Sequence, residues 1–228
     1  MRAVGPSRRL ERALGAHAAR AGVSLIEVAI VITLLGVFAQ SAWMALDTGT
    51  RVLETGSERS ALQARASKAM GQVTRALTLA GIDSMTGVPA APFFDDRISF
   101  ESLDAVDTNT GTLSWTAHEI RLESEPGEKD DGLDNDGDGL IDEGRIVHVI
   151  APGTAEEREV TIASGIAELY PGESWNGKDD NGNGLIDEHG LAFALDGERL
   201  RILLSLEAVD GEEREVARSL ETTLRIRN

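Results

Sequence analysis

The chain has 228 residues, of which 41% are apolar and 27% charged, so it is long enough for one globular domain with a hydrophobic core. It contains no cysteine, which excludes disulfides, thiolate zinc sites and cysteine nucleophiles. The net charge is −17, and because an acidic protein repels nucleic-acid phosphates, we expect no nucleic-acid partner. Divalent cations or basic partners are the ligands that this charge favours.

Residues 1–22 form a basic segment that precedes an apolar one. They carry five arginines and one glutamate, a net charge of +4, whereas the remaining residues sum to −21. From Val28 to Leu46 the chain has 19 consecutive uncharged residues, close to the ~20 that span a bilayer as a helix. Basic residues mark the cytoplasmic flank of a membrane helix, so we predict a cytoplasmic leader over residues 1–22 and a transmembrane helix over residues 23–46. The candidate cleavage residue, Gly22, precedes the apolar run, so this run is expected to stay in the mature protein.

An amphipathic pattern continues the predicted helix over residues 47–81. Charged side chains are interleaved with apolar residues that recur at spacings of three and four, as on one face of a helix. These apolar residues are Leu62, Ala66, Ala69, Val73, Ala76 and Ala80. We therefore predict one nearly continuous helix from about Ser24 to Ala80, stopped by Gly81.

The remaining residues, 82–228, change to the two-residue period of strands. Two alternating segments near the C-terminus, about 200–208 and 216–226, are predicted to form a hairpin. The other strand candidates are Arg97–Leu103, Thr112–Glu123, Arg145–Ile150, Glu159–Ala163 and Leu191–Leu195. The predicted fold class is α+β, with one long N-terminal helix packed on a mostly antiparallel β-sheet domain.

Glu27 stands at the start of the apolar helix, where an ionised carboxylate is costly unless it has a partner. No Lys or Arg follows it until Arg51. The nearest plausible cation is an α-amine created by cutting the bond between Gly22 and Val23. In a helical assembly that amine can come from a neighbouring copy, so we predict that this pair sets the register between subunits.

The segment Gly22-Val23-Ser24-Leu25-Ile26-Glu27-Val28 resembles the prepilin cleavage and methylation motif of bacterial pilins and pseudopilins. The resemblance implies a pilin fold and a prepilin peptidase that cuts after Gly22 and methylates Val23, while Glu27 aligns the subunit during assembly. It also implies other pilins or pseudopilins and an inner-membrane assembly platform as partners. The expected location is the bacterial inner membrane, with the N-terminus in the cytoplasm and the domain in the periplasm, and then a pilus or pseudopilus.

Short segments of the domain resemble PilW-type minor pilins and the related GspJ-type pseudopilins of type II secretion. The first resemblance implies a subunit of a type IV pilus or of its tip or initiation complex. The second implies a subunit of the periplasmic pseudopilus of type II secretion. A third interpretation, from a different class, is a membrane-anchored calcium-dependent adhesin that does not polymerise.

An acidic segment occurs twice, 45 residues apart. Residues 126–143 and 171–188 are identical at 11 of 18 positions without a gap. In each copy, oxygen-bearing side chains alternate and then meet a glycine, and this pattern resembles the EF-hand-type calcium loop. Eight acidic residues and one lysine give residues 127–143 a net charge of −7, and residues 172–188 carry −4. Because this self-repulsion opposes folding without a counterion, the sequence predicts up to two bound Ca²⁺ ions that stabilise the domain, in acidic loops over 126–144 and 171–189.

The calcium-loop resemblance implies a ligand set in each copy. In the first copy the set is Asp134, Asp136, Asp138, the Leu140 carbonyl, and Asp142 directly or through water. In the second it is Asp179, Asn181, Asn183, the Leu185 carbonyl and Asp187. The loop's last acidic ligand would fall at Arg145 and Gly190, which cannot serve. Either Asp142 with Glu143 and Asp187 with Glu188 substitute for it, or the upstream residues Asp130, Asp131 and Asn176 fold back.

Catalytic motifs are not apparent in the sequence. Its histidines have no second histidine at a metal-binding spacing, and its serines lack a nucleophile-elbow context. His118 and His148 lie on strand candidates, where we expect them to face solvent or to be satisfied locally. Trp115 and Trp175 are expected to lie in the core or to anchor loops rather than to bind ligands. We therefore predict that the protein is not an enzyme.

Overall fold

The computed structural model describes residues 24–78, 80, 84–106, 108, 110–211 and 214–225, with only the backbone of Glu54, Thr55 and Asp104. The predicted leader with its cleavage site, Gly22 and Val23, lies outside the described residues, as does the predicted helix stop Gly81. The chain comprises two units, Met1–Thr50 and Arg51–Asn228.

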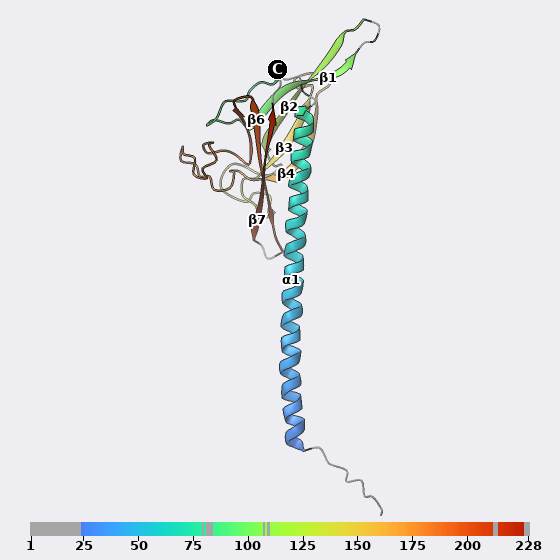
Figure 1. Ribbon diagram of the computed structural model, residues 1–228, viewed down its shortest axis with the longest axis vertical. Coiled ribbons are helices and arrows are strands. Elements are labelled where there is room, and N and C mark those ends of the chain that lie inside the picture. Colours follow the sequence, from blue (N-terminus) through green and yellow to red (C-terminus); the bar gives the residue numbers. More distant parts are fainter. Residues whose placement is uncertain are drawn as a thin grey trace, which may run out of the picture. The chain divides into compact units, whose positions relative to one another are not determined.

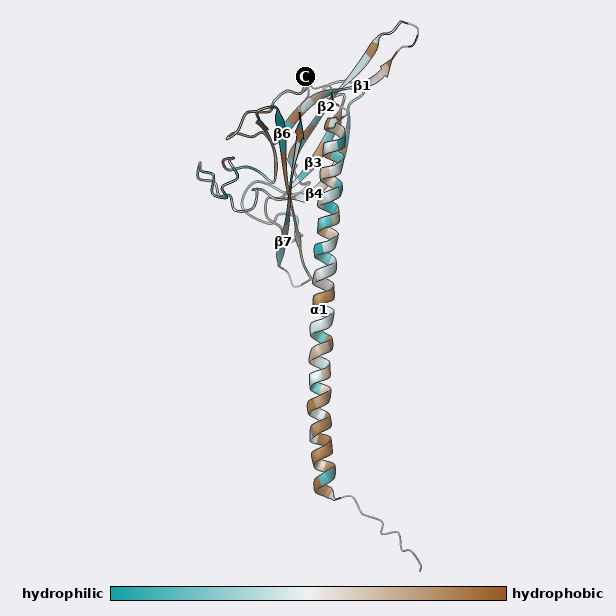
Figure 2. Cartoon of the chain, viewed as in Figure 1, coloured by the Kyte–Doolittle hydropathy of each residue, from teal (hydrophilic) through white to brown (hydrophobic). Residues whose placement is uncertain are grey.

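A single helix, α1 (Leu25–Thr78), covers the segment predicted as helical (Figure 1). Its first half is predominantly apolar, as Figure 2 shows, and it is long and apolar enough to span a bilayer by length and composition. None of this apolar window is buried within the molecule, and Leu25 and Phe38 are 87% and 78% exposed. This half of α1 therefore has the surface of a helix that is covered by lipid or by other helices.

The second half of α1 packs one face against the sheet. The residues that it buries are Leu62, Ala66, Ala69, Met70, Val73 and Leu77. This confirms most of the predicted apolar stripe, but its end differs, because Leu77 is buried and the predicted Ala76 is only half-buried. Ala80 lies beyond the helix, where it forms a bridge with Ser102 of β1.

Seven strands form one sheet, and every predicted strand is present. The strands are β1 (Arg97–Val106), β2 (Leu113–Ser124), β3 (Gly144–Ile150), β4 (Arg158–Ile166), β5 (Leu191–Asp196), β6 (Arg199–Val209) and β7 (Glu215–Arg225). Their order is β1-β2-β3-β4-β6-β5, with β7 also paired to β6, and all of these pairings are antiparallel. The structure therefore confirms the α+β class and the C-terminal hairpin.

The hydrophobic core lies between α1 and the sheet. Side chains of six strands meet the buried face of α1 there, with Ile98, Ile120, Ile146 and Phe193 fully buried. A smaller cluster, made by Leu185, Ala192, Ala194 and Leu203, lies apart from this main core. Leu185 belongs to the second acidic segment, so that segment is attached to the fold by a buried apolar side chain.

The two acidic loops leave the sheet at the same end. Loop 1 (residues 126–144) joins β2 to β3, and loop 2 (residues 171–189) joins β4 to β5. Ser124 pairs with Gly144, and Gly144 pairs with Ile166, so the ends of β2 and β4 flank the start of β3. The sheet register, rather than any local signal, therefore brings together two loops that are 45 residues apart in the sequence.

Close backbone packing beside loop 2 leads to a stability prediction. A Cβ at Gly190 would lie 2.2 Å from the carbonyl oxygen of Ala167, which is backbone and cannot rotate away. We expect Gly190→Ala to lower the stability of the sheet unit by about 3 kcal/mol, or the melting temperature by roughly 6–12 °C. Gly71→Ala is the matched control, because a Cβ added at Gly71 would have nothing within 4 Å and Gly71 lies in a helix. Equal melting temperatures for the two variants in thermal unfolding would contradict the predicted clash.

Candidate functional site

Both acidic loops fold in the same way, because their repeated side chains bind their own backbone. In loop 1, the carboxylate of Asp134 accepts hydrogen bonds from the N–H groups of Gly137 and Gly139 at 2.6 and 3.0 Å. In loop 2, Asp179 accepts from Gly182 and Gly184 at 2.6 and 2.8 Å. The glycines at these positions have positive φ values of 76–93°, which side chains rarely adopt. The repeated Asp and Gly residues therefore specify one loop conformation.

The second and third residues of each predicted ligand set also bind the backbone. Asp136 accepts from the N–H of Asp138 at 3.0 Å, and Asp138 accepts from Leu140 at 2.9 Å. The asparagines of loop 2 do the same through Oδ1, with 2.9 Å from Asn183 N–H to Asn181 and 2.9 Å from Leu185 N–H to Asn183. Each Asp of loop 1 has a second carboxylate oxygen, whereas the matching Asn has an NH₂ group in its place.

Asp142 and Asp187 close their loops. Both oxygens of Asp142 accept backbone N–H groups, those of Asp131 and Gly132, at 3.0 and 2.7 Å. Asp187 accepts in the same way from Asn176 and Gly177, at 3.1 and 2.7 Å. The backbone at the start of each loop therefore folds back onto Asp142 or Asp187, but through N–H groups, which donate hydrogen bonds and are not metal ligands. The side chains of Leu140 and Leu185 are buried under the loops.

A glutamate lies under each loop, at a position that the sequence analysis did not single out. Glu128 Oε1 accepts from the N–H groups of Asn135 and Asp136 at 2.9 and 2.8 Å. Glu173 Oε1 accepts from Asn181 at 3.0 Å. Both glutamates are at least nine-tenths buried. The signal that could have found them is the Pro-Gly-Glu triplet, which is repeated at the start of both copies.

Glu143 and Glu188 follow the loop-closing aspartates and are completely buried. Neither oxygen of Glu143 has a hydrogen-bond partner among the described residues. Burial, together with the charges of Asp138, Glu128 and Glu125, raises the pKa of Glu143 to about 7. A buried carboxylate without a donor is costly, so this position favours either a proton or a cation.

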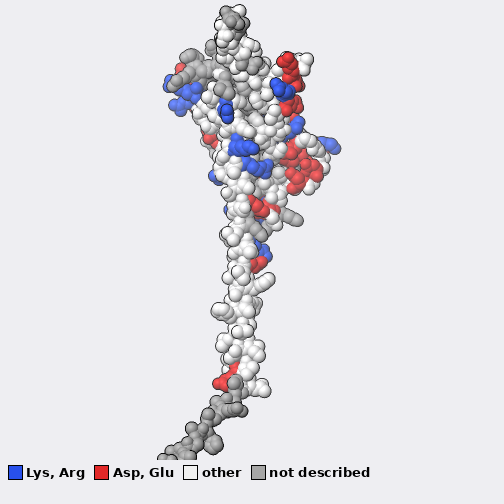
Figure 3. Space-filling view, turned by 90° about the vertical axis from the view of Figure 1, so that its right-hand side faces the viewer, with Lys and Arg blue, Asp and Glu red and all other residues white. Residues whose placement is uncertain are grey.

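Acidic side chains gather on the sheet unit, whereas the first half of α1 is nearly free of charge (Figure 3). Within loop 1 and its flank, the carboxylates form two close groups. Oxygen atoms of Glu125, Asp136 and Glu143 lie within 4.8 Å of one another, and so do those of Glu128, Asp134 and Asp136. Calcium binds about six to eight hard oxygen ligands, and these groups supply such ligands around a buried, partnerless carboxylate. These groups could therefore hold a metal ion, and carboxylate oxygens are ligands of the kind that calcium binds.

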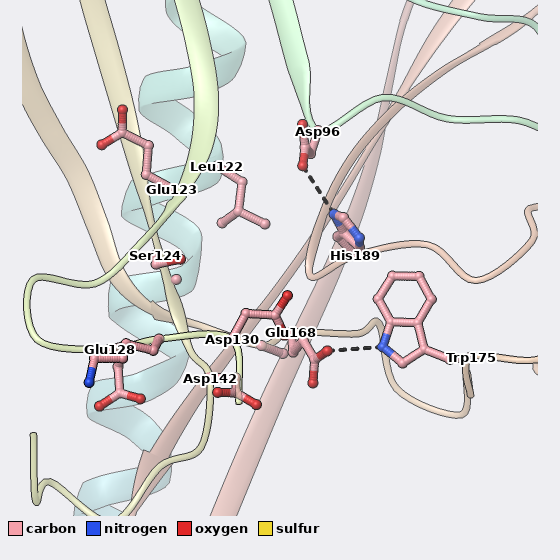
Figure 4. A pocket seen from close by; sticks show the side chains of 13 residues that line it. Asp96, Leu122, Glu123, Ser124, Glu128, Asp130, Asp142, Glu168, Trp175 and His189 are labelled. Atoms are coloured by element: carbon pink, nitrogen blue, oxygen red, sulfur yellow. Dashed lines mark hydrogen bonds and ion pairs between the residues drawn. The ribbon is translucent and has the colours of Figure 1, made fainter. Parts of the chain in front are cut away.

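A cavity of about 260 Å³ opens between the flanks of the two loops (Figure 4). Its aromatic side is held by Trp175, whose Nε1 donates to Glu168 at 2.9 Å. His189 pairs with Asp96 at 3.1 Å and lies edge-on to the Trp175 ring, with centroids 5.3 Å apart. These lining side chains bind one another, and Trp175 is nevertheless 58% exposed. Trp115 lies on β2 and is 47% exposed, so it is not in the core.

Glu27 lies in a capping box at the start of α1. Its Oε2 accepts the backbone N–H of Ser24 at 3.1 Å, and Ser24 Oγ accepts the N–H of Ile26 at 3.4 Å. The carboxylate thus has a local hydrogen-bond donor, which the sequence analysis did not consider. An N–H donor does not neutralise the charge, although the positive end of the helix dipole favours it there.

Two histidines, which the sequence analysis treated separately, contact each other across β2 and β3. His118 Nδ1 and His148 Nε2 are 3.1 Å apart, and Ser102 Oγ lies 2.7 Å from His118 Nε2. Phe100 stacks on the His118 ring at a centroid distance of 5.3 Å. The two histidines are 30 residues apart in the chain, so only the sheet register reveals the pair.

Because of this pair, we expect a lower pH to reduce the stability of the folded state. Burial and the His118 charge lower the pKa of His148 below its ordinary value of 6.5. The unfolded chain therefore binds this proton at a higher pH than the folded chain does, so stability falls as the pH drops through 6.5. We expect the melting temperature to fall less between pH 7 and about pH 5 in His148→Gln, which does not titrate, than in the wild type. Identical pH profiles would contradict this role.

Comparison with known proteins gives no relative: no family model, no curated protein and no solved structure matches this chain.

Proposed function

We propose that this chain is a filament subunit of the pilin and pseudopilin class: a minor pilin that assembles into a type IV pilus or its tip complex, with calcium bound in its acidic loops. The observation that carries the proposal is the division of one helix into two surfaces. The second half of α1 buries a face against the sheet. The first half leaves Leu25, Phe38 and Trp43 at least 73% exposed.

An uncovered apolar helix of this length needs a nonpolar partner. A bilayer covers it before assembly, and the equivalent helices of neighbouring subunits cover it in a filament. Glu27 supports the second environment, because it is the one acidic residue in the otherwise uncharged first turns of α1. In a filament core it can pair with the terminal amine of an adjacent copy. The Ser24 N–H is an uncharged donor, so it cannot neutralise the Glu27 carboxylate as that amine can.

The sheet unit supports a periplasmic or extracellular setting with calcium as its stabilising ion. It has no cysteine, so disulfides do not strengthen it. The partnerless carboxylate of Glu143 beside Glu125 and Asp136 supplies the electrostatic reason for a cation. Binding to the folded state alone would then stabilise the unit.

Mass spectrometry of the mature protein from its native host tests the subunit proposal. We expect a chain that begins at Val23 with a methylated N-terminus. An intact Met1, or a cut elsewhere, would contradict the proposal and favour the membrane-anchored adhesin. Identifying the proteins that co-purify with the chain distinguishes a pilus subunit from a type II secretion pseudopilin.

A further inference from the structure

Loop 1 and loop 2 share the backbone hydrogen bonds that Asp134 and Asp142, or Asp179 and Asp187, accept, but they differ in the side chains around their buried glutamates. Four acidic residues lie close to Glu143, and three of them have a neutral residue 45 positions later, while the fourth, Glu128, matches Glu173. The pairs are Glu125 and Tyr170, Asp136 and Asn181, and Asp138 and Asn183. The two loops therefore present different chemistry to a cation within one conformation.

In loop 2, amide groups occupy the place that a cation would need. Asn181 Nδ2 donates to Glu188 Oε1 at 2.9 Å, and Asn183 Nδ2 donates to the same oxygen. The Oδ1 atoms of both asparagines are already bound to backbone N–H groups. To place Oδ1 beside Glu188, where Nδ2 now lies, each amide would have to rotate, which breaks both of its hydrogen bonds. Loop 2 is therefore held together by its own amide donors.

In loop 1, no such donor reaches the buried glutamate. Both oxygens of Glu143 lack a partner among the described residues, whereas Glu188 lacks one for Oε2 alone. Asp136 and Asp138 cannot donate such a hydrogen bond, because each has a carboxylate oxygen where the matching asparagine has its NH₂ group. The group formed by Glu125, Asp136 and Glu143 is thus an anionic cluster around a completely buried carboxylate.

We infer that the chain binds a single calcium ion, in loop 1, through Glu125, Asp136 and Glu143, and that loop 2 reaches the same conformation without metal. This inference rests on the calcium part of the proposed function and reduces the expected number of ions from up to two to one. It adds Glu125, which lies outside the EF-hand-type ligand set, and it assigns no ion to Asp179, Asn181 or Asn183.

The ion in loop 1 also links the loop to the sheet. Glu125 Oε1 accepts the N–H of Gly165 in β4 at 2.6 Å, so a ligand of the ion is fastened to the strand that precedes loop 2. Gly165 in turn has no room for a side chain, because a Cβ there would lie 2.8 Å from the carbonyl oxygen of Glu207. Calcium in loop 1 therefore reinforces the junction of β2, β3 and β4.

Counting bound calcium tests the inference on the full chain in detergent. Equilibrium dialysis against calcium is expected to give one ion per chain for the wild type, none for Glu143→Gln and one for the matched control Glu188→Gln. Two ions on the wild type would overturn the inference while leaving the calcium proposal intact. No ion on the wild type would overturn both, and loss of the ion in Glu188→Gln alone would overturn the assignment to loop 1.

Exchanging the differing residues between the loops gives variants that are expected to fold, because each new residue already occurs at the matching position of the other loop. Asp136→Asn with Asp138→Asn copies loop 2 into loop 1 and is expected to abolish calcium binding without a change in the circular dichroism spectrum. Tyr170→Glu with Asn181→Asp and Asn183→Asp copies all three differing residues of loop 1 into loop 2 and is expected to raise the count from one ion toward two. Retained binding in the double variant would overturn the inference.

Discussion

A chain carrying Glu27→Gln is expected to insert into the membrane as the wild type does and to fail to enter filaments. Glutamine still accepts the Ser24 N–H that Glu27 accepts at 3.1 Å, so the capping box is kept and only the charge is removed. Loss of one partner of a buried ion pair costs about 3 kcal/mol, or roughly a hundredfold in incorporation. The measurement is the amount of the variant in sheared filaments relative to the membrane fraction.

Ser24→Ala is the matched control for this experiment. It removes the hydroxyl that accepts the Ile26 N–H at 3.4 Å, but it leaves the Glu27 charge in place. Its effect is limited to about 1 kcal/mol of helix capping, so we expect it to assemble nearly normally. If Glu27→Gln assembles and Ser24→Ala does not, Glu27 acts through the helix cap and not through a neighbouring subunit.

Removal of calcium is expected to lower the melting temperature of the sheet unit by about 5–10 °C. A ligand present at about 100 times its dissociation constant stabilises the folded state by ~2.7 kcal/mol, and for a chain of this size each kcal/mol corresponds to about 2–4 °C. The measurement is thermal unfolding of the full chain in detergent, with saturating calcium and with a chelator. The change should be reversed when calcium is restored.

Two controls connect this effect to loop 1. Glu143→Gln removes the buried carboxylate that is proposed as a ligand. This variant should unfold at the same temperature with and without calcium, because it should no longer bind the ion. Magnesium should stabilise the wild type less than calcium does, since it requires a stricter octahedral geometry. A chelator effect that persists in Glu143→Gln would place the ion outside the cluster of Glu125, Asp136 and Glu143.

The secondary structure was predictable because its signals are local. The period of 3.6 residues ending near Leu77 and the two-residue alternation of the strands are consequences of backbone geometry that a short window of sequence displays. The stripe differs from the prediction in the additional burial of Met70 and at its end, where Leu77 replaces Ala76 as the chain leaves the helix for the bridge between Ala80 and Ser102.

The candidate site was only partly predictable. The repeat identified both loops, because an aspartate that binds its own backbone and a glycine at positive φ lie within a few residues of each other. Glu125 was not identified, since it precedes the repeat and meets Glu143 only when β2 and β3 pair. The pair of His118 and His148 was missed for the same reason.

The sequence by itself determined the long helix, the seven strands and two loops of one conformation. Each of these depends on neighbours along the chain, through periodicity, capping and turn chemistry. Only the tertiary structure decided which carboxylates are buried, which of them lack a donor and which face an asparagine amide. The physical reason is that the free energy of a charge depends on everything within a few ångströms of it, and Glu143 meets Glu125 because β2 and β3 pair.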